Sequence, residues 1–130
     1  MAEPNPSRDE ARQQAIREAL AELRAEYAEG LPTIVGELTA AAEKANASSS
    51  DVDFRHLQTL AHRMHGAAGS YGFKGTSEAA AKLEELLTAR EKSPLAERAA
   101  SAAAIAAALT GVQETVRQEL ADFLATRQSV

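Results

Sequence analysis

Residues 60–73 read Leu60-Ala61-His62-Arg63-Met64-His65-Gly66-Ala67-Ala68-Gly69-Ser70-Tyr71-Gly72-Phe73, and they hold two of the chain's three histidines and three of its seven glycines. On a helical wheel of about 100° per residue, the apolar residues in and just before this stretch gather on one side, across a sector of roughly 100°. The pattern predicts a helix that packs this side into a core and presents both histidines outward. The apolar side comprises Leu57, Leu60, Ala61, Met64 and Ala68, and the outward side comprises Arg55, Gln58, His62, His65, Gly66 and Gly69.

Two glycines of this stretch occupy special positions. Gly66 lies one turn after His62 on the outward side, where a glycine costs about 1 kcal/mol relative to alanine. A reason to keep it is that another molecule can then approach closely beside His62. Gly72 suits the position just after a helix end, where a left-handed backbone conformation is common.

The sequence His62-Arg63-Met64-His65-Gly66, followed by Gly72, resembles the motif of histidine-phosphotransfer (HPt) domains of two-component phosphorelays. That motif is His-x-Leu-Lys-Gly with a second glycine six residues after the first. Met64 fills the Leu position conservatively, whereas His65 stands where the family has Lys. The order of the predicted helices extends the resemblance to nearly the whole chain. The resemblance implies that His62 is the residue that accepts the phosphoryl group.

Composition limits the fold class and the kinds of partner. A chain of 130 residues fits one domain with a core of its own. Aromatic residues make up only 4% of the chain, which favours helix packing because strands prefer β-branched and aromatic residues. The absence of cysteine excludes a disulfide framework and thiolate metal sites. A net charge of −5 without clustered Lys and Arg argues against nucleic-acid binding.

Targeting and membrane segments are not expected. Residues 1–6 lack the basic and apolar regions of a signal peptide. The longest apolar run, near residues 102–109, is far shorter than the ~18 residues that span a bilayer. We therefore expect a cytoplasmic protein without a membrane segment, in which residues 1–6 form a disordered tail and residues 7–130 form a single domain.

Periodicity and capping residues predict five helices and no strand. A capping box at residues 7–10 begins the first helix, and Gly30 ends it because Pro32 suits the first turn of the next one. Short connections between the later helices predict an all-α antiparallel four-helix bundle, with the first helix as an additional N-terminal helix. HPt domains have this architecture. The predicted helices span residues 7–30, 31–46, 51–71, 76–92 and 95–126, the fourth of them beginning at Thr76 or Ser77.

The resemblance implies a chemistry that needs a nucleophile on an accessible surface. A neutral imidazole, whose unperturbed pKa is about 6.5, can take a phosphoryl group from an aspartyl phosphate and form a phosphoramidate. Transfer depends on positioning and charge stabilisation, and the partner would hold the Mg²⁺, so this chain needs no cofactor. The expected phosphate or partner surface consists of Arg55, Gln58, His65, Gly66 and Gly69.

His65 and Glu84 distinguish this sequence from the family pattern. One hypothesis is that a protonated His65 helps to hold the phosphate and that its help weakens as the pH rises; the alternative is a neutral histidine without a role. Glu84 lies where several family members carry a Gln that points at the histidine. A carboxylate repels a phosphoryl group, so Glu84 either turns away or binds the unphosphorylated imidazole.

Three functions are compatible with these residues. The first is a phosphocarrier, not itself an enzyme, that accepts a phosphoryl group on His62 from a receiver-domain aspartate of a response regulator or a hybrid histidine kinase and passes it to another receiver. The second is an HPt-like interaction protein that binds a receiver or kinase without being phosphorylated, which the missing Lys favours. The third is metal binding by His62 and His65, but no metal site is expected because a histidine pair without a third ligand is a weak site. A monomer is the expected state of a closed bundle.

Overall fold

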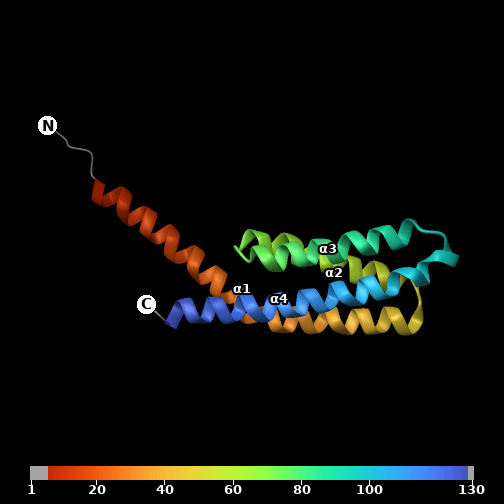
Figure 1. Cartoon of the computed structure of the whole chain (residues 1–130). Coiled ribbons are helices and arrows are strands. Elements are labelled where there is room, and N and C mark those ends of the chain that lie inside the picture. The colour runs from red at the N-terminus through yellow and green to blue at the C-terminus, as the bar shows by residue number, and fades with distance from the viewer. Residues whose placement is uncertain (1–5, 129–130) are drawn as a thin grey trace.

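The computed structural model describes residues 6–128, which form four α-helices and one 3-10 helix and no strand (Figure 1). The all-α bundle predicted from the sequence is confirmed. Pro6, the last residue of the predicted tail, is the first residue of a helix. Residues 1–5 of the predicted tail and residues 129–130 lie outside the described part of the chain. The helices are α1 (Pro6–Ser48), α2 (Asp51–Ser70), α3 (Lys74–Lys92), η1 (Leu95–Ser101) and α4 (Ala102–Gln128).

Helix α1 continues through Gly30 and Pro32, so the predicted separation into two helices at Gly30 is wrong. Proline in a helix interior removes one backbone hydrogen bond and ordinarily costs about 3 kcal/mol. Here Pro32 is exposed, while Leu31 and Leu38 are buried in the core, so packing before and after the proline holds the helix. Figure 1 shows that α1 changes direction in its orange part and that its N-terminal half leaves the bundle at an angle.

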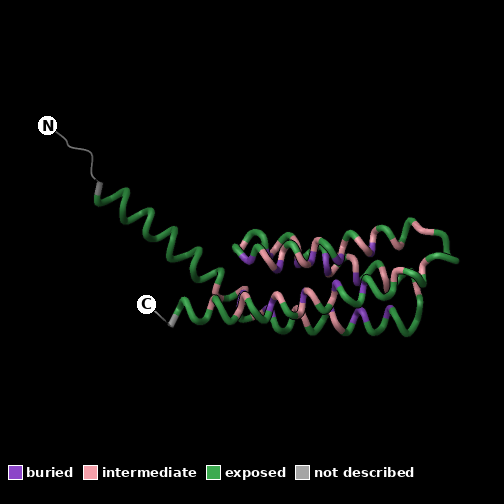
Figure 2. Tube along the Cα trace, in the orientation of Figure 1, coloured by how far each residue is buried: buried purple, intermediate pink, exposed green. Residues whose placement is uncertain are grey.

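The core lies where the four helices meet, and the N-terminal half of α1 has no part in it (Figure 2). The wheel prediction for α2 is confirmed, because the residues of the predicted apolar side are buried or, in the case of Leu60, half-buried against the core. Residues 7–24 of α1 are exposed throughout, including Ile16, Leu20 and Leu23. The largest fully buried side chains are Phe73, Leu31, Leu38, Leu57, Met64, Leu83, Val112 and Thr76.

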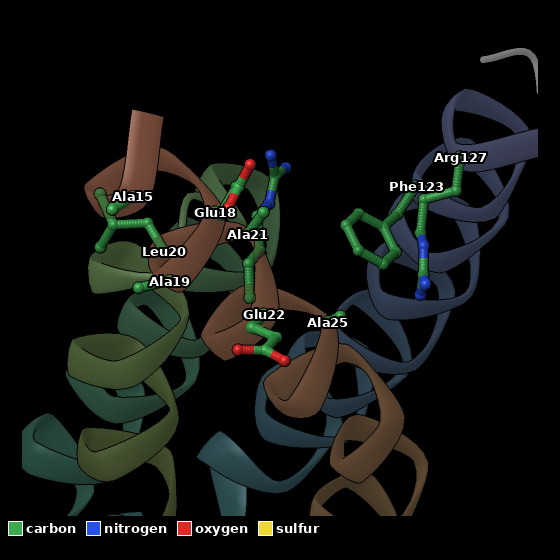
Figure 3. A pocket seen from close by; sticks show the side chains of 10 residues that line it. Ala15, Glu18, Ala19, Leu20, Ala21, Glu22, Ala25, Phe123 and Arg127 are labelled. Carbon is green, nitrogen blue, oxygen red and sulfur yellow. The ribbon is translucent and has the colours of Figure 1, made fainter. Parts of the chain in front are cut away.

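An open groove separates the N-terminal half of α1 from the end of α4. Figure 3 shows Phe123 and Arg127 of α4 on one side and Ala21 and Ala25 of α1 on the other. None of the residues that line the groove belongs to α2. The groove is therefore separate from the surface that carries His62.

The turn between α2 and α3 is held by backbone hydrogen bonds and by aromatic packing. The backbone N–H of Phe73 donates to the Ala68 carbonyl at 2.8 Å, and that of Gly72 donates to the Gly69 carbonyl at 3.2 Å. This pair of bonds closes a helix end of the Schellman type, and Gly72 has the left-handed backbone predicted for it, with φ of 82°. Phe73 is buried, with its ring centroid 5.9 Å from that of Tyr27. The turn is thus anchored in the end of the core.

Helix α3 begins at Lys74, two or three residues before the predicted start at Thr76 or Ser77, and its N-terminus is capped from another helix. The Glu119 carboxylate of α4 accepts hydrogen bonds from the backbone N–H groups of Gly75, at 3.2 Å, and Thr76. A carboxylate at this position satisfies otherwise unpaired N–H groups and interacts favourably with the helix dipole. Helix α4 therefore helps to fix where α3 starts.

Helices α2 and α3 meet in one antiparallel register. Four cross-helix pairs lie along their outward junction, and each pair is centred on Phe73, with its two members equally far before and after that residue in the chain. On α2 the four members follow one another at steps of three, four and seven residues, which is the spacing of a single helix face. The pairs are Arg55–Glu91, Gln58–Thr88, His62–Glu84 and Gly69–Ser77.

The last 33-residue helical stretch, Leu95–Arg127, is long and apolar enough to cross a membrane by length and composition. The sequence prediction, which considered uninterrupted apolar runs, did not identify it. One face of this stretch is buried in the core through Ile105, Ala108, Val112 and Val116, and many of the exposed residues are alanines. The core helix of a soluble protein can satisfy the same criterion, so it does not by itself indicate a membrane span.

The split of α1 into a packed and a protruding half predicts unequal effects of two leucine truncations. Leu31→Ala removes a fully buried side chain and should lower the free energy of unfolding by about 2–5 kcal/mol. Leu20→Ala, the matched change on the protruding half where Leu20 is 59% exposed, should alter it by no more than about 0.5 kcal/mol. Urea unfolding followed by circular dichroism measures both. A loss for Leu20→Ala as large as that for Leu31→Ala would contradict the protruding arrangement.

Candidate functional site

His62 lies on the outward side of α2, with 73% of its side chain exposed. Its neighbours Ala61 and Met64 are buried, which fixes the rotation of α2 about its axis. The Nδ1 atom of His62 lies 2.8 Å from Oε2 and 3.2 Å from Oε1 of Glu84 on α3. Within the described part of the chain, the side-chain hydrogen bonds of His62 involve Nδ1 only. Glu84 thus orients the imidazole ring through one nitrogen.

The contact with Glu84 selects one tautomer of the His62 imidazole. An ionised carboxylate can only accept hydrogen bonds, so Nδ1 must carry the proton and donate. In a neutral imidazole, a proton on Nδ1 leaves the lone pair on Nε2. The geometry therefore leaves the lone pair of this exposed imidazole on Nε2.

His65 lies one turn further along α2 and faces the same carboxylate. Its side chain is 45% exposed, and its Nδ1 lies 4.0 Å from Glu84 Oε2. Glu84, whose side chain is 24% exposed, is thus shared by the two histidines. Of the two alternatives that the sequence left open for Glu84, the structure has the one in which it binds the unphosphorylated imidazole.

The two glycines beside the histidines have different surroundings. A Cβ atom added to Gly66 would meet nothing within 4 Å, so the fold itself does not need a glycine there. A Cβ atom added to Gly69 would lie 3.1 Å from Ser77 Oγ, which donates a hydrogen bond to the His65 carbonyl at 2.7 Å. Gly69 therefore permits the close approach of α2 and α3, whereas Gly66 leaves open space on the surface near His62.

Arg55 and Gln58 share the outward side with His62, as predicted, but both are engaged by α3. Arg55 Nε lies 3.3 Å from Glu91 Oε1, and Gln58 Nε2 donates to Thr88 Oγ1 at 2.8 Å. The Arg55–Glu91 pair is exposed, and such pairs contribute only about 0–1 kcal/mol. The Arg55–Glu91 pair therefore contributes little to the stability of the junction between α2 and α3.

The sequence did not identify the α3 partners of these residues, which are Ser77, Thr88 and Glu91. Each of them lies at the position that a register centred on Phe73 assigns to it. The signal that could have found them is Gly72, because the length of the turn sets this register.

Comparison with known proteins shows the family of the chain. The family model for the Hpt domain matches residues 14–125, and the chain belongs to this family. The recognition based on the His62–Gly66 motif is thereby confirmed. No curated protein and no solved structure matches the chain. Hpt domains are phosphocarrier modules of two-component signalling rather than catalytic enzymes.

The open space at Gly66 predicts opposite effects of Gly66→Ala on stability and on docking. Alanine is the better helix former, so the free energy of unfolding should rise by up to about 1 kcal/mol. The added methyl group should nevertheless slow phosphoryl transfer from a phosphorylated receiver, because it projects into the surface near His62. Gly36→Ala is the matched control, since Gly36 is also helical with nothing within 4 Å and lies on α1. Transfer to Gly66→Ala as fast as to Gly36→Ala would refute this interpretation of Gly66.

Proposed function

We propose that this protein is a histidine-containing phosphocarrier in a phosphorelay. It accepts a phosphoryl group on Nε2 of His62 from the aspartyl phosphate of a receiver domain, in a response regulator or a hybrid histidine kinase, and passes it to another receiver. The observation that best supports this proposal is the exposed His62 imidazole, whose Nδ1 lies 2.8 Å from the Glu84 carboxylate. The proposal includes a cytoplasmic location, a single domain over residues 7–130, and no nucleic-acid partner.

The proposed transfer needs little from this chain beyond an oriented imidazole. The Nε2 lone pair attacks phosphorus while the bond between phosphorus and the aspartate oxygen breaks, and the aspartate leaves as a carboxylate. The proton stays on Nδ1, so the phosphorylated ring is cationic, and the Glu84 carboxylate faces that charge. The partner supplies the Mg²⁺ and most of the charge stabilisation. The reverse reaction with a second receiver releases the phosphoryl group.

Phosphorylation of the purified protein tests the acceptor residue. Incubation with phosphoramidate should add one phosphoryl group, labile in acid, to the wild type and to His56→Ala, and none to His62→Ala. His56 is the matched control because it is the remaining histidine of α2 and is also exposed. Intact mass spectrometry reads the result. Labelling of His62→Ala would overturn the assignment of the acceptor.

Glu84 is proposed as a positioning residue, since it acts through the His62 ring. The His62 side chain is 73% exposed and that of Glu84 24%, and charge pairs that solvent reaches contribute about 0–1 kcal/mol. Glu84→Ala should therefore slow labelling of His62 by no more than about fivefold, the rate equivalent of ~1 kcal/mol. Glu85→Ala, an exposed change of the same charge one residue along α3, should leave the rate unchanged. Equal rates for the two variants would contradict a role of Glu84 in selecting the tautomer.

A second candidate function is an HPt-like interaction protein that binds a receiver or kinase without being phosphorylated. The observation that favours it is His65, which stands at the Lys position and faces the Glu84 carboxylate. This acidic neighbour also balances the charge with which a protonated His65 would hold a phosphate. Failure of both phosphoramidate and a phosphorylated receiver to label the wild type would support this second function over the first.

A further inference from the structure

His62, His65 and Glu84 form a cluster of three donor groups at the outward junction of α2 and α3. One donor atom from each residue lies within 4.8 Å of the other two. The sequence argued against a metal site because the histidine pair lacked a third ligand, and the fold supplies that ligand from α3. We propose that this cluster binds one divalent transition-metal ion, such as Zn²⁺, and that the bound ion prevents phosphorylation of His62.

The donor set suits this class of ion. Two imidazole nitrogens and one carboxylate oxygen are typical ligands of Zn²⁺ in sites whose fourth position is held by water. Zinc–ligand bonds of about 2.0–2.2 Å in a tetrahedron place neighbouring donors roughly 3.3–3.5 Å apart. Glu84 Oε2 lies 2.8 Å from Nδ1 of His62 and 4.0 Å from Nδ1 of His65, and these distances lie on either side of that range.

Little movement is needed to close the site. The two histidines lie three residues apart on one helix, so they project from the same side of a rigid backbone. Glu84 is already in contact with His62 and faces His65, and both imidazole rings are at least partly exposed. Rotations of exposed side chains can therefore bring the three donors around one ion without shifting α2 against α3.

Metal binding and phosphorylation compete for the same imidazole. An ion on Nδ1 of His62 takes the lone pair there, so the proton of the neutral ring moves to Nε2, which then cannot attack phosphorus. An ion on Nε2 instead occupies the nucleophilic lone pair directly. Conversely, a phosphoryl group on Nε2 leaves Nδ1 protonated and unable to bind a metal. Metal binding does not depend on the proposed function, whereas the antagonism between metal binding and phosphorylation rests on that function.

Direct titration tests the metal site without any activity assay. Zn²⁺ is titrated into the folded protein in competition with a chromophoric indicator, using the wild type, His65→Ala, Glu84→Ala and the control His56→Ala. The wild type and His56→Ala should bind one Zn²⁺ per chain with equal affinity, and the other two variants should bind it at least about tenfold more weakly. Equal affinity for all four proteins, or weaker binding by His56→Ala, would overturn the site.

The antagonism is tested by labelling with phosphoramidate, with and without saturating Zn²⁺, on the wild type and on His65→Lys. The ratio of the two labelling rates is compared, so that any change in the basal rate of the variant cancels. Zn²⁺ should suppress labelling of the wild type by at least about tenfold and should affect His65→Lys far less. A wild type that binds Zn²⁺ in the titration yet is labelled equally fast would overturn the antagonism. Absence of labelling even without Zn²⁺ would instead contradict the proposed function and leave the metal site to be decided by the titration.

Discussion

The antiparallel register between α2 and α3 is the constraint on which the surface around His62 depends. The left-handed backbone of Gly72 ends α2, the buried ring of Phe73 anchors the turn, and the Glu119 carboxylate of α4 caps the start of α3. With the turn fixed, pairs centred on Phe73 face each other along the whole junction. The Glu84 carboxylate faces His62 for this reason, because no interaction within α2 itself could bring it there. The chemistry of one exposed imidazole is thus decided by a turn eleven residues away.

Local patterns predicted the helices well where burial and periodicity coincide. The apolar side of α2 was predicted from spacing alone, since a 20-residue helix repeats its face often enough for the pattern to be unambiguous. The predicted break at Gly30 is wrong because packing of the helix outweighs the two local signals, Gly30 and Pro32. A helix-interior proline costs about 3 kcal/mol, whereas burial of a leucine contributes roughly 1.5–3 kcal/mol. Burial of Leu31 and Leu38 together therefore matches or exceeds the cost of Pro32.

Only part of the candidate site could be predicted from the sequence. The outward direction of both histidines follows from the periodicity of one helix, which can be recognised in the sequence. The contacts of Arg55, Gln58 and Gly69 with α3 are properties of two helices, and they depend on where α3 begins. That start lies two or three residues earlier than the sequence predicted, because its cap comes from Glu119, more than forty residues further along the chain. Side-chain capping of this kind leaves no signal near the helix that it caps.

Two departures from the family pattern act together at His62. A lysine at position 65 would add a fixed positive charge and, while protonated, would have no lone pair to offer a metal. A glutamine at position 84 could still accept a hydrogen bond from Nδ1 of His62, but it would carry no charge and would be a poorer ligand than a carboxylate. With a glutamine at position 84, His65 would have no anionic donor beside it. With a lysine at position 65, Glu84 would form an ion pair with that lysine. Only the combination of His65 and Glu84 gives two imidazoles and a carboxylate around one point. Under the proposed phosphotransfer and the proposed metal binding, the group on Nδ1 of His62, a proton held by Glu84 or a metal ion, would determine whether Nε2 is a nucleophile.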